Sequence, residues 1–213
     1  MTKELVRLYD GKKCYEIDTC GLKRVLPIRQ VGDGVWIASN HILVLGDLEF
    51  IEAAAKDLAS RLSKYEIELI VTAEAKAGPL AYEVSKKLDL PYLVVCRKSV
   101  KAYMNNPLAT ELKSITTEDV QKLTLDETDV DRIRGKKVAL LDDVTTTGGN
   151  MNAMENIVNK AGGKVVVKAC VWVEGPSTAG GSAQARKNLE YIDYLPLFLS
   201  KEKYEHIAKM RES

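Results

Sequence analysis

The sequence predicts an α/β protein with a central parallel β-sheet flanked by helices. Short apolar runs rich in β-branched residues alternate with segments whose apolar residues recur at helical spacing; the runs are residues 67–72, 92–96, 138–141 and 165–173. Runs of this kind are typical of strands that are buried on both faces of a parallel sheet. The intervening segments supply the helical crossovers that parallel strands need.

Three segments are expected to form those helices. Residues 48–62 and 80–88 each place apolar residues on one helical face, and residues 151–160 end at Gly162 and Gly163, a helix stop signal. We expect the apolar stripes to pack against the sheet as core.

Two stretches depart from the alternating pattern. Asp33 and Gly34 have hairpin-turn chemistry between two apolar runs, which indicates a small antiparallel element near the N-terminus. Residues 99–134 are rich in Thr, Asp, Glu and Lys and carry the turn signal Asn105-Asn106-Pro107. Loops of this length inside a compact domain are usually functional lids or disordered, so we expect a long flexible loop here.

Composition limits the classes of partner. The formal net charge is +1, which gives no bulk attraction to nucleic acid or membrane, so we expect neither as a partner. The first ten residues carry Lys3, Glu4 and Arg7 without a long apolar run, so a cytoplasmic protein is expected. At 213 residues the chain is expected to form a single domain.

Residues 138–150 (VALLDDVTTTGGN) contain the strongest functional signal. An apolar strand leads into two acids and a Thr- and Gly-rich turn that opens a helix: Asp142, Asp143, Thr145, Thr146, Thr147, Gly148 and Gly149. Backbone N–H groups at such a turn favour a phosphate, and carboxylates beside it can accept hydrogen bonds from vicinal sugar hydroxyls. Any two of these residues alone would be no more than a helix cap and a turn. The full run predicts a ribose 5-phosphate site.

This ordered run resembles the signature for 5-phosphoribosyl-1-pyrophosphate (PRPP) of the type I phosphoribosyltransferases. Residues 72–78 (TAEAKAG) resemble the family's pyrophosphate loop, with Lys76 where arginine is usual, and Arg97-Lys98 resembles the pair that contacts pyrophosphate. Alone, these three cations would be ordinary solvated charges. The resemblance implies that Ala75, Lys76, Arg97 and Lys98 join the signature residues in binding PRPP. It also implies a cis peptide bond, which we expect at Ala75–Lys76.

The resemblance implies a fold, a reaction and a cofactor. Residues 1–46 would form a hood over the base, residues 47–198 the core and residues 99–134 a lid. The enzyme would transfer the 5-phosphoribosyl group to a base in a homodimer, with Mg²⁺ held through PRPP near Asp142 and Asp143 rather than directly by the protein. These two carboxylates and Lys76 are the expected catalytic groups. Glu111, in a segment similar to a loop of adenine phosphoribosyltransferases, is either a proton-transfer group or a solvated glutamate.

The base is predicted from the hood and the signature. Thr146 stands where 6-oxopurine enzymes usually have aspartate, which favours adenine. Val35, Trp36 and Ile37 are similar in placement to the apolar hood residues of the adenine enzymes, although Trp36 could equally be core. The family's Phe-Arg-Asp is replaced by Ile37-Ala38-Ser39 and its closing threonine by Asn150, so xanthine, orotate or another base stays open. The turn-rich residues 174–182 could line the base pocket or be an inert connection.

Two other classes of function compete with this one. A non-catalytic PRPP-binding regulator usually carries a basic DNA-binding domain, and the sequence shows no helix-turn-helix segment before the core. A nucleotide hydrolase is disfavoured because no nucleophile lies beside a base in the sequence. The enzyme is the favoured reading.

Overall fold

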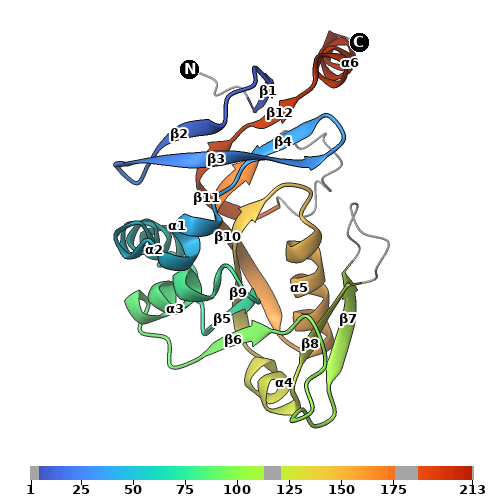
Figure 1. Ribbon diagram of the computed structural model, residues 1–213. Helices are drawn as coiled ribbons and strands as arrows, with labels where there is room; N and C mark the ends of the chain where they lie inside the picture. The colour runs from blue at the N-terminus through green and yellow to red at the C-terminus, as the bar shows by residue number, and fades with distance from the viewer. Residues whose placement is uncertain (1–4, 113–120, 176–186, 213) are drawn as a thin grey trace.

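The computed structural model describes residues 5–112, 121–175 and 187–212. A five-stranded parallel sheet lies at its centre (Figure 1). The strands are, in spatial order, β11 (Leu189–Leu195), β10 (Lys164–Glu174), β9 (Lys137–Thr145), β5 (Leu69–Ala73) and β6 (Leu93–Cys96). Every neighbouring pair is parallel, so the predicted fold class is confirmed. The four predicted apolar runs are β5, β6, β9 and β10, whereas β11 was not predicted.

Helices cover both faces of this sheet. Helices α2 (Leu48–Leu62) and α3 (Gly78–Lys87) pack on one face, and α5 (Gly149–Lys160) packs on the other (Figure 1). Alternate residues of one strand enter different cores: Ile70 packs with the α2 and α3 residues, and Val71 packs with α5. All three predicted helices are confirmed, because their apolar stripes match faces of a sheet that is buried on both sides. No helix of the described residues is long and apolar enough to cross a membrane.

A second sheet sits above the carboxyl end of the first. Its spatial order is β1 (Val6–Leu8), β12 (Leu197–Leu199), β4 (Val35–Ala38), β3 (Leu22–Gly32) and β2 (Cys14–Thr19). β3 and β4 pair as the predicted hairpin, and Gly34 in its turn has a φ of +61°. The short helix α1 (His41–Gly46) leads from β4 back to the core.

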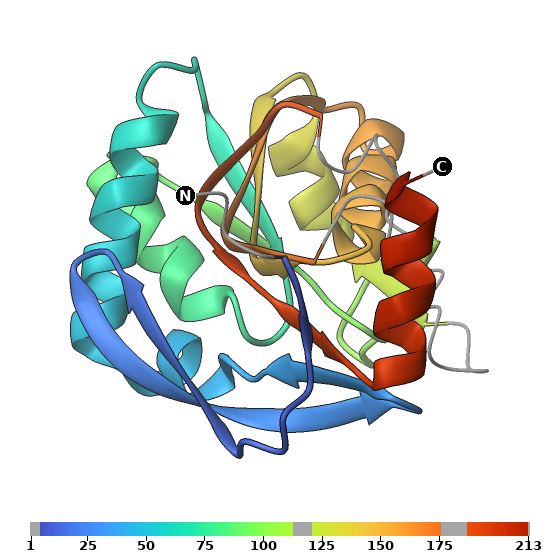
Figure 2. The same cartoon turned by 90° about the horizontal axis from the view of Figure 1, so that it is seen from above.

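The second sheet also takes a strand from the C-terminus, which the sequence reading missed. β12 lies between β1 and β4, and α6 (Lys201–Glu212) follows it against β1 and β12 (Figure 2). The boundaries 1–46 and 47–198 therefore do not divide hood from core, since residues 197–199 belong to the hood sheet. These residues are all buried. Three buried residues have no polar alternation that would mark a strand.

The described parts of residues 99–134, which are 99–112 and 121–134, contain regular elements as well as turns. β7 (Leu108–Leu112) and β8 (Gln121–Leu125) form an antiparallel hairpin, followed by α4 (Glu127–Ile133). Leu123, Leu125 and Ile133 are fully buried in the core that contains α5. The expected loop therefore includes a hairpin and a helix that this apolar burial holds in place. The predicted lid's centre, residues 113–120, lies outside the described residues.

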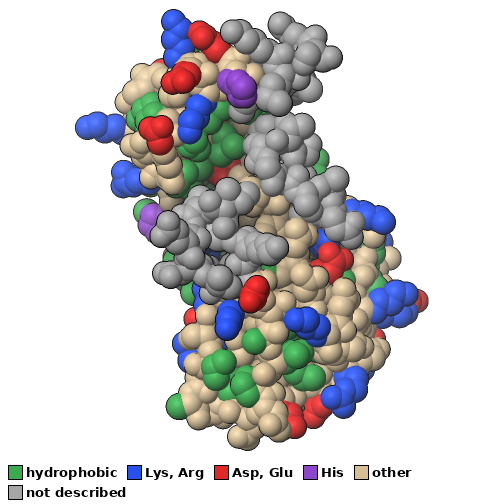
Figure 3. Space-filling view, turned by 90° about the vertical axis from the view of Figure 1, so that its right-hand side faces the viewer, with side chains coloured by type: hydrophobic (Ala, Val, Ile, Leu, Met, Phe, Trp, Pro, Cys, Tyr) green, Lys and Arg blue, Asp and Glu red, His purple; other side chains and the backbone are tan. Residues whose placement is uncertain are grey.

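The surface carries charges of both signs. On the face seen in Figure 3, Lys and Arg side chains are interspersed with Asp and Glu wherever side chains are described, in keeping with the formal net charge of +1.

A glycine replacement tests the packing behind α5. A Cβ at Gly163 would lie 2.6 Å from Ile133 Cγ2 and 3.1 Å from the Ile133 carbonyl oxygen. Gly163→Ala is expected to lower the free energy of unfolding by about 1–3 kcal/mol, the usual cost of overpacking. Urea unfolding measures it. The matched control is Gly46→Ala, where nothing lies within 4 Å and a helical position favours alanine, so stability should be unchanged or higher. Equal effects of the two replacements would contradict the packing described.

Candidate active site

The polar side chains of the signature lie where three parallel strands end. β9 ends at Thr145, just after Asp142 and Asp143, with β5 and β10 as its neighbours. The 74–77 segment follows β5, and Glu174 is the last residue of β10. In open α/β sheets, ligands bind outside the carboxyl ends of the strands. The structure thus brings the 138–150 signature and the 72–78 segment together at the expected edge of the sheet. Arg97, which follows β6, belongs to the third sequence motif.

Asp143, on β9, accepts hydrogen bonds from side chains of two other segments. Its Oδ2 atom accepts a hydrogen bond from Lys76 Nζ at 2.8 Å and another from Asn40 Nδ2 at 2.9 Å. The Asp143 side chain is 4% exposed, whereas that of Lys76 is 44% exposed. Sequence reasoning predicted Asp143 and Lys76 but missed Asn40, which lies between β4 and α1. No motif marks Asn40, and its side chain contacts Asp143 instead of capping its own helix.

Asp142 is buried and hydrogen-bonded on both oxygens. Its Oδ1 accepts from the Asp143 backbone N–H at 2.9 Å, and its Oδ2 accepts from Asn150 Nδ2 at 3.1 Å. Burial, followed by the neighbouring Asp143 charge, raises the pKa of Asp142 to about 8. A proton on the Asp142 carboxyl is therefore favoured near neutral pH. Asn150, where the signature ends, contributes directly to this arrangement.

The raised pKa of Asp142 gives a stability prediction. A raised folded-state pKa means that the folded chain keeps a proton that the unfolded chain releases near pH 4. The free energy of unfolding should therefore fall as the pH rises from about 4 to 8, by at most about 1.4 kcal/mol per pH unit for this proton. Urea unfolding at pH 5, 6.5 and 8.5 measures this fall, and Asp142→Asn should make it shallower. An unchanged slope in the variant would contradict the assignment.

The phosphate cradle lies at the start of α5. Gly148 has a φ of +81° and occupies the N-cap position, so the chain turns sharply from β9 into the helix. Thr145 is 2% exposed, and its Oγ1 atom has no hydrogen-bond partner among the described residues. Thr146 Oγ1 donates to Glu174 Oε2 at 2.8 Å. A sharp turn into a helix N-terminus, lined by threonine hydroxyls, can hold a phosphate.

Glu174 is a buried carboxyl that sequence reasoning noticed only as the first residue of a turn-rich loop. Burial raises its pKa to about 7, against the lowering effects of the Thr146 hydrogen bond and the Lys76 charge. An apolar strand that ends in an acid is the one signal that could have identified it, as it identified Asp142 and Asp143. Residues 176–182 of that loop lie outside the described residues.

The segment after β5 carries a non-proline cis peptide bond, between Glu74 and Ala75. The expected position, Ala75–Lys76, was wrong by one bond. The Glu74 N–H still donates to the Cys96 carbonyl at 2.9 Å, so regular pairing ends at Glu74 and the chain turns directly after it.

Two of the predicted cations behave differently from Lys76. Arg97 Nε lies 2.5 Å from Glu74 Oε2 as an ion pair, although neither atom makes a well-directed hydrogen bond there. Lys98 is exposed. The structure therefore brings Arg97 to the loop that carries Ala75 and Lys76, whereas Lys98 lies at the surface beside it.

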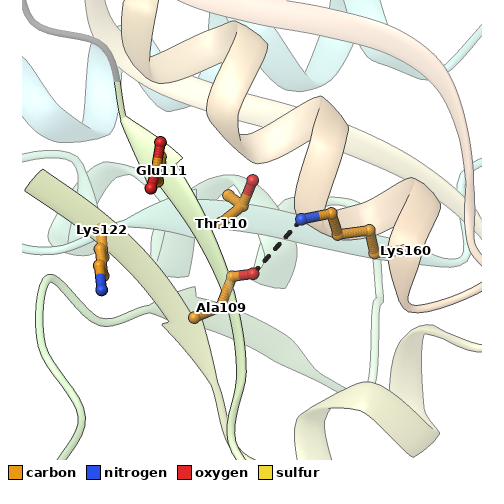
Figure 4. A pocket seen from close by; sticks show the side chains of 5 residues that line it. All are labelled: Ala109, Thr110, Glu111, Lys122 and Lys160. Atoms are coloured by element: carbon orange, nitrogen blue, oxygen red, sulfur yellow. Dashed lines mark hydrogen bonds between the residues drawn. The ribbon is translucent and has the colours of Figure 1, made fainter. Parts of the chain in front are cut away.

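Glu111 lies apart from the carboxylates, on β7. It lines a pocket of about 430 Å³ between the hairpin and α5, whose described lining residues are Ala109, Thr110, Glu111, Lys122 and Lys160 (Figure 4). Lys160 Nζ lies 3.5 Å from the Ala109 carbonyl oxygen, and Glu111 stands opposite Lys122 in the hairpin. The role of Glu111 in proton transfer stays a prediction.

The predicted base-binding residues are on β4 of the second sheet. Val35, Trp36 and Ile37 are half-buried and pair with β12. The Trp36 ring stacks on Tyr9, with ring centroids 4.1 Å apart and planes at 19°. One face of the indole is therefore already covered by a neighbour within the hood.

Comparison with known proteins identifies the family. The family model described as the phosphoribosyl transferase domain matches residues 45–193. Adenine phosphoribosyltransferase of Thermosipho africanus is 32% identical over 134 residues, 58% of this chain and 69% of that protein. Hypoxanthine/guanine phosphoribosyltransferase of Methanotorris igneus is 30% identical over 152 residues, 70% of this chain and 72% of that protein.

Solved structures of related enzymes share the fold. Adenine phosphoribosyltransferase from Thermoanaerobacter pseudethanolicus has a TM-score of 0.61 at 19% identity, over 85% of this chain and 95% of that one. The Giardia lamblia enzyme, solved with 9-deazaadenine, has a TM-score of 0.62 at 16% identity, over 85% and 93%. At these identities the structural similarity shows the fold alone. The assignment to a family rests on the sequence matches. The chain belongs to the phosphoribosyltransferase family of enzymes, and its named relatives are purine phosphoribosyltransferases.

Proposed function

We propose that this enzyme transfers the 5-phosphoribosyl group from PRPP to a purine, with adenine as the preferred base, and releases pyrophosphate. The observation that carries the proposal is the grouping of Asp143, Lys76 and the threonine turn at one edge of the sheet. A diol acceptor, a cation and a phosphate cradle side by side match the three polar parts of PRPP.

Each part of the site has a proposed partner on PRPP. The 145–149 turn holds the 5-phosphate, through Thr145, Thr146, Thr147, Gly148 and Gly149. Asp142 and Asp143 hold the ribose hydroxyls, and because the raised pKa of Asp142 favours its protonated form near neutral pH, Asp142 can donate a hydrogen bond as well as accept one. Ala75, Lys76, Arg97 and Lys98 receive the pyrophosphate.

The proposed catalysis is positioning and charge stabilisation. As the bond to the anomeric carbon breaks, the leaving pyrophosphate gains negative charge, which Lys76 and Arg97 offset. Among the described residues no group of three His, Cys, Asp or Glu side chains could hold a metal ion. As implied by the resemblance, Mg²⁺ would be held by oxygens of PRPP, near Asp142 and Asp143, where its charge would add to that of the lysine. Glu111 is the proposed proton-transfer group.

The hood supports the choice of a purine. Val35, Trp36 and Ile37 would contact the base, with Trp36 already held flat by Tyr9. The absence of aspartate at Thr146 favours adenine. A 6-oxopurine is the second candidate, because the Methanotorris igneus relative, named for hypoxanthine and guanine, matches 70% of this chain. We further propose a single-domain cytoplasmic enzyme that works as a homodimer.

A base panel tests the proposal. Purified protein, PRPP and Mg²⁺ are incubated with adenine, hypoxanthine, guanine, xanthine, uracil or orotate, and nucleotide and pyrophosphate are measured by chromatography. Adenosine monophosphate as the main product is the expected result. A different nucleotide would keep the reaction and overturn the base assignment. No product with any base, despite saturable PRPP binding, would point to the regulatory alternative.

A further inference from the structure

Asn40 connects the second sheet to the candidate active site. Only Ser39 separates Asn40 from β4, and Asn40 is 5% exposed. Its Nδ2 atom donates a hydrogen bond to Asp143 Oδ2 at 2.9 Å, between residues that lie 103 positions apart in the sequence. A buried side chain of the hood thus contacts the carboxylate that is proposed to bind the ribose.

The backbone around Asn40 is held by hydrogen bonds of its own. The Ser39 N–H donates to the Pro27 carbonyl at 2.8 Å, and the Leu43 N–H donates to the Asn40 carbonyl at 3.0 Å. An asparagine that precedes a helix commonly accepts a backbone N–H with its side chain. The Asn40 side chain makes no such bond to α1 and contacts Asp143 instead. A fixed backbone that directs an amide at a carboxylate is the arrangement expected of a supporting residue.

Two donors converge on one oxygen of Asp143. Lys76 Nζ also donates to Oδ2, at 2.8 Å, from the segment after β5. Hydrogen bonds to one oxygen from two segments limit the rotation of the carboxylate. The Lys76 side chain is 44% exposed and is proposed to serve the pyrophosphate as well, whereas Asn40 is buried beneath the hood. Asn40 is therefore the donor whose contact with Asp143 is independent of the leaving group.

We propose that Asn40 is a positioning residue for the transfer reaction: its amide holds the Asp143 carboxylate in the orientation that receives the ribose hydroxyls. The inference rests on the proposed function, because it assumes that Asp143 binds the ribose of PRPP. It gives the hood a second task. The residues of β4 are proposed to contact the base, and Asn40, just after β4, acts on the sugar through Asp143.

Two replacements remove the donor and keep a side chain of similar size. In Asn40→Leu, kcat/KM for PRPP should fall about tenfold, because a hydrogen bond to a charged group is lost. Asn40→Asp should lose about 30- to 100-fold at pH 8.5, since it also places a second carboxylate against Asp143. Asn156→Asp is the matched control: it adds the same charge at an exposed position of α5 and should stay within about twofold of wild type.

A double-mutant cycle shows whether Asn40 acts through Asp143. In the Asp143→Asn protein each Asn40 replacement should cost at most about threefold, because the charged acceptor is already gone. The new amide can also donate to the carboxylate of Asn40→Asp. Losses of the same size in both backgrounds would mean that Asn40 acts through another contact, which overturns the inference. Values of kcat/KM within about twofold of wild type in both single variants overturn it as well.

The KM for adenine separates the positioning of Asp143 from general support of the hood. In Asn40→Leu this KM should change less than about twofold, whereas a displaced hood would raise it as strongly as kcat/KM for PRPP falls. A rise of that size overturns the inference.

Thermal unfolding of each variant confirms that it is folded at the assay temperature. Asn40→Ser replaces any variant that is not, because serine suits the residue before a helix and its hydroxyl ends one bond short of the amide nitrogen. If the wild-type protein forms no nucleotide with any base, the proposed function fails and the inference fails with it. An active wild type with unaffected Asn40 variants overturns the inference alone.

Discussion

Asp143→Asn is expected to lower kcat/KM for PRPP about 30- to 100-fold, because it removes the charged acceptor at the centre of the site. In the free protein Asp143 accepts from both Lys76 and Asn40. Hydrogen bonds to charged groups contribute about 1.5–3 kcal/mol each, and 1.4 kcal/mol corresponds to a factor of ten in rate. An asparagine keeps the size of the side chain but has one acceptor oxygen and no charge to balance the lysine. Steady-state kinetics with varied PRPP measure the loss.

Asp131→Asn is the matched control for this replacement. Asp131 is exposed on α4 and pairs with Arg134 at 3.2 Å, so its change should leave kcat/KM within twofold of wild type. Thermal unfolding of both variants separates a loss of function from a loss of fold. A folded Asp143→Asn protein with kcat/KM within twofold of wild type would contradict the proposed role in binding the ribose.

The buried parts of the fold were predictable because nearly all of their residues are apolar. The strands β5, β9 and β10 are apolar on both faces, which is sufficient to mark them as inner strands of a parallel sheet. The helix α2 begins after Asp47, whose side chain accepts from the Phe50 N–H, so even its first residue follows from a local capping signal.

The elements that were missed depend on distant partners. β12 is three residues long and exists because β1 and β4 lie on either side of it, a pairing that joins the two ends of the chain. The hairpin of β7 and β8 is held by burial of Leu123 and Leu125 against the α5 core, in a stretch whose polar composition suggested a loop. Tertiary contacts decide such segments, and they leave little trace in local sequence.

Within the site, too, residues that belong to local motifs could be predicted, and residues that depend on distant contacts could not. Asp142, Asp143 and Lys76 lie in short ordered motifs, so they could be predicted together. Asn40 and Glu174 are single residues whose importance comes from what they contact, Asp143 in one case and Thr146 in the other. Their contacts connect the hood and β10 to the signature loop, and no spacing rule along the chain contains that information.

Lys76→Met is expected to lower kcat about 100- to 1000-fold, with a smaller effect on PRPP affinity. Loss of one donor that stabilises charge developing in the transition state typically removes about 2.7–4 kcal/mol of stabilisation. The pyrophosphate gains charge only as its bond to the sugar breaks, so the ammonium should act more strongly on the transition state than on bound PRPP. Pre-steady-state kinetics and equilibrium titration with PRPP separate the two quantities.

Two further variants test whether the loss of kcat depends on a positive charge at position 76. Lys86→Met removes an exposed lysine on α3 that pairs with Glu83, and it should leave kcat unchanged. Lys76→Arg keeps a cation within reach of Asp143 and of the pyrophosphate, so it should recover most of the activity. Equal losses in kcat for Lys76→Met and Lys76→Arg would mean that packing matters more than charge. Loss of PRPP affinity with unchanged kcat would mean that Lys76 binds substrate and transition state equally, which contradicts its proposed role.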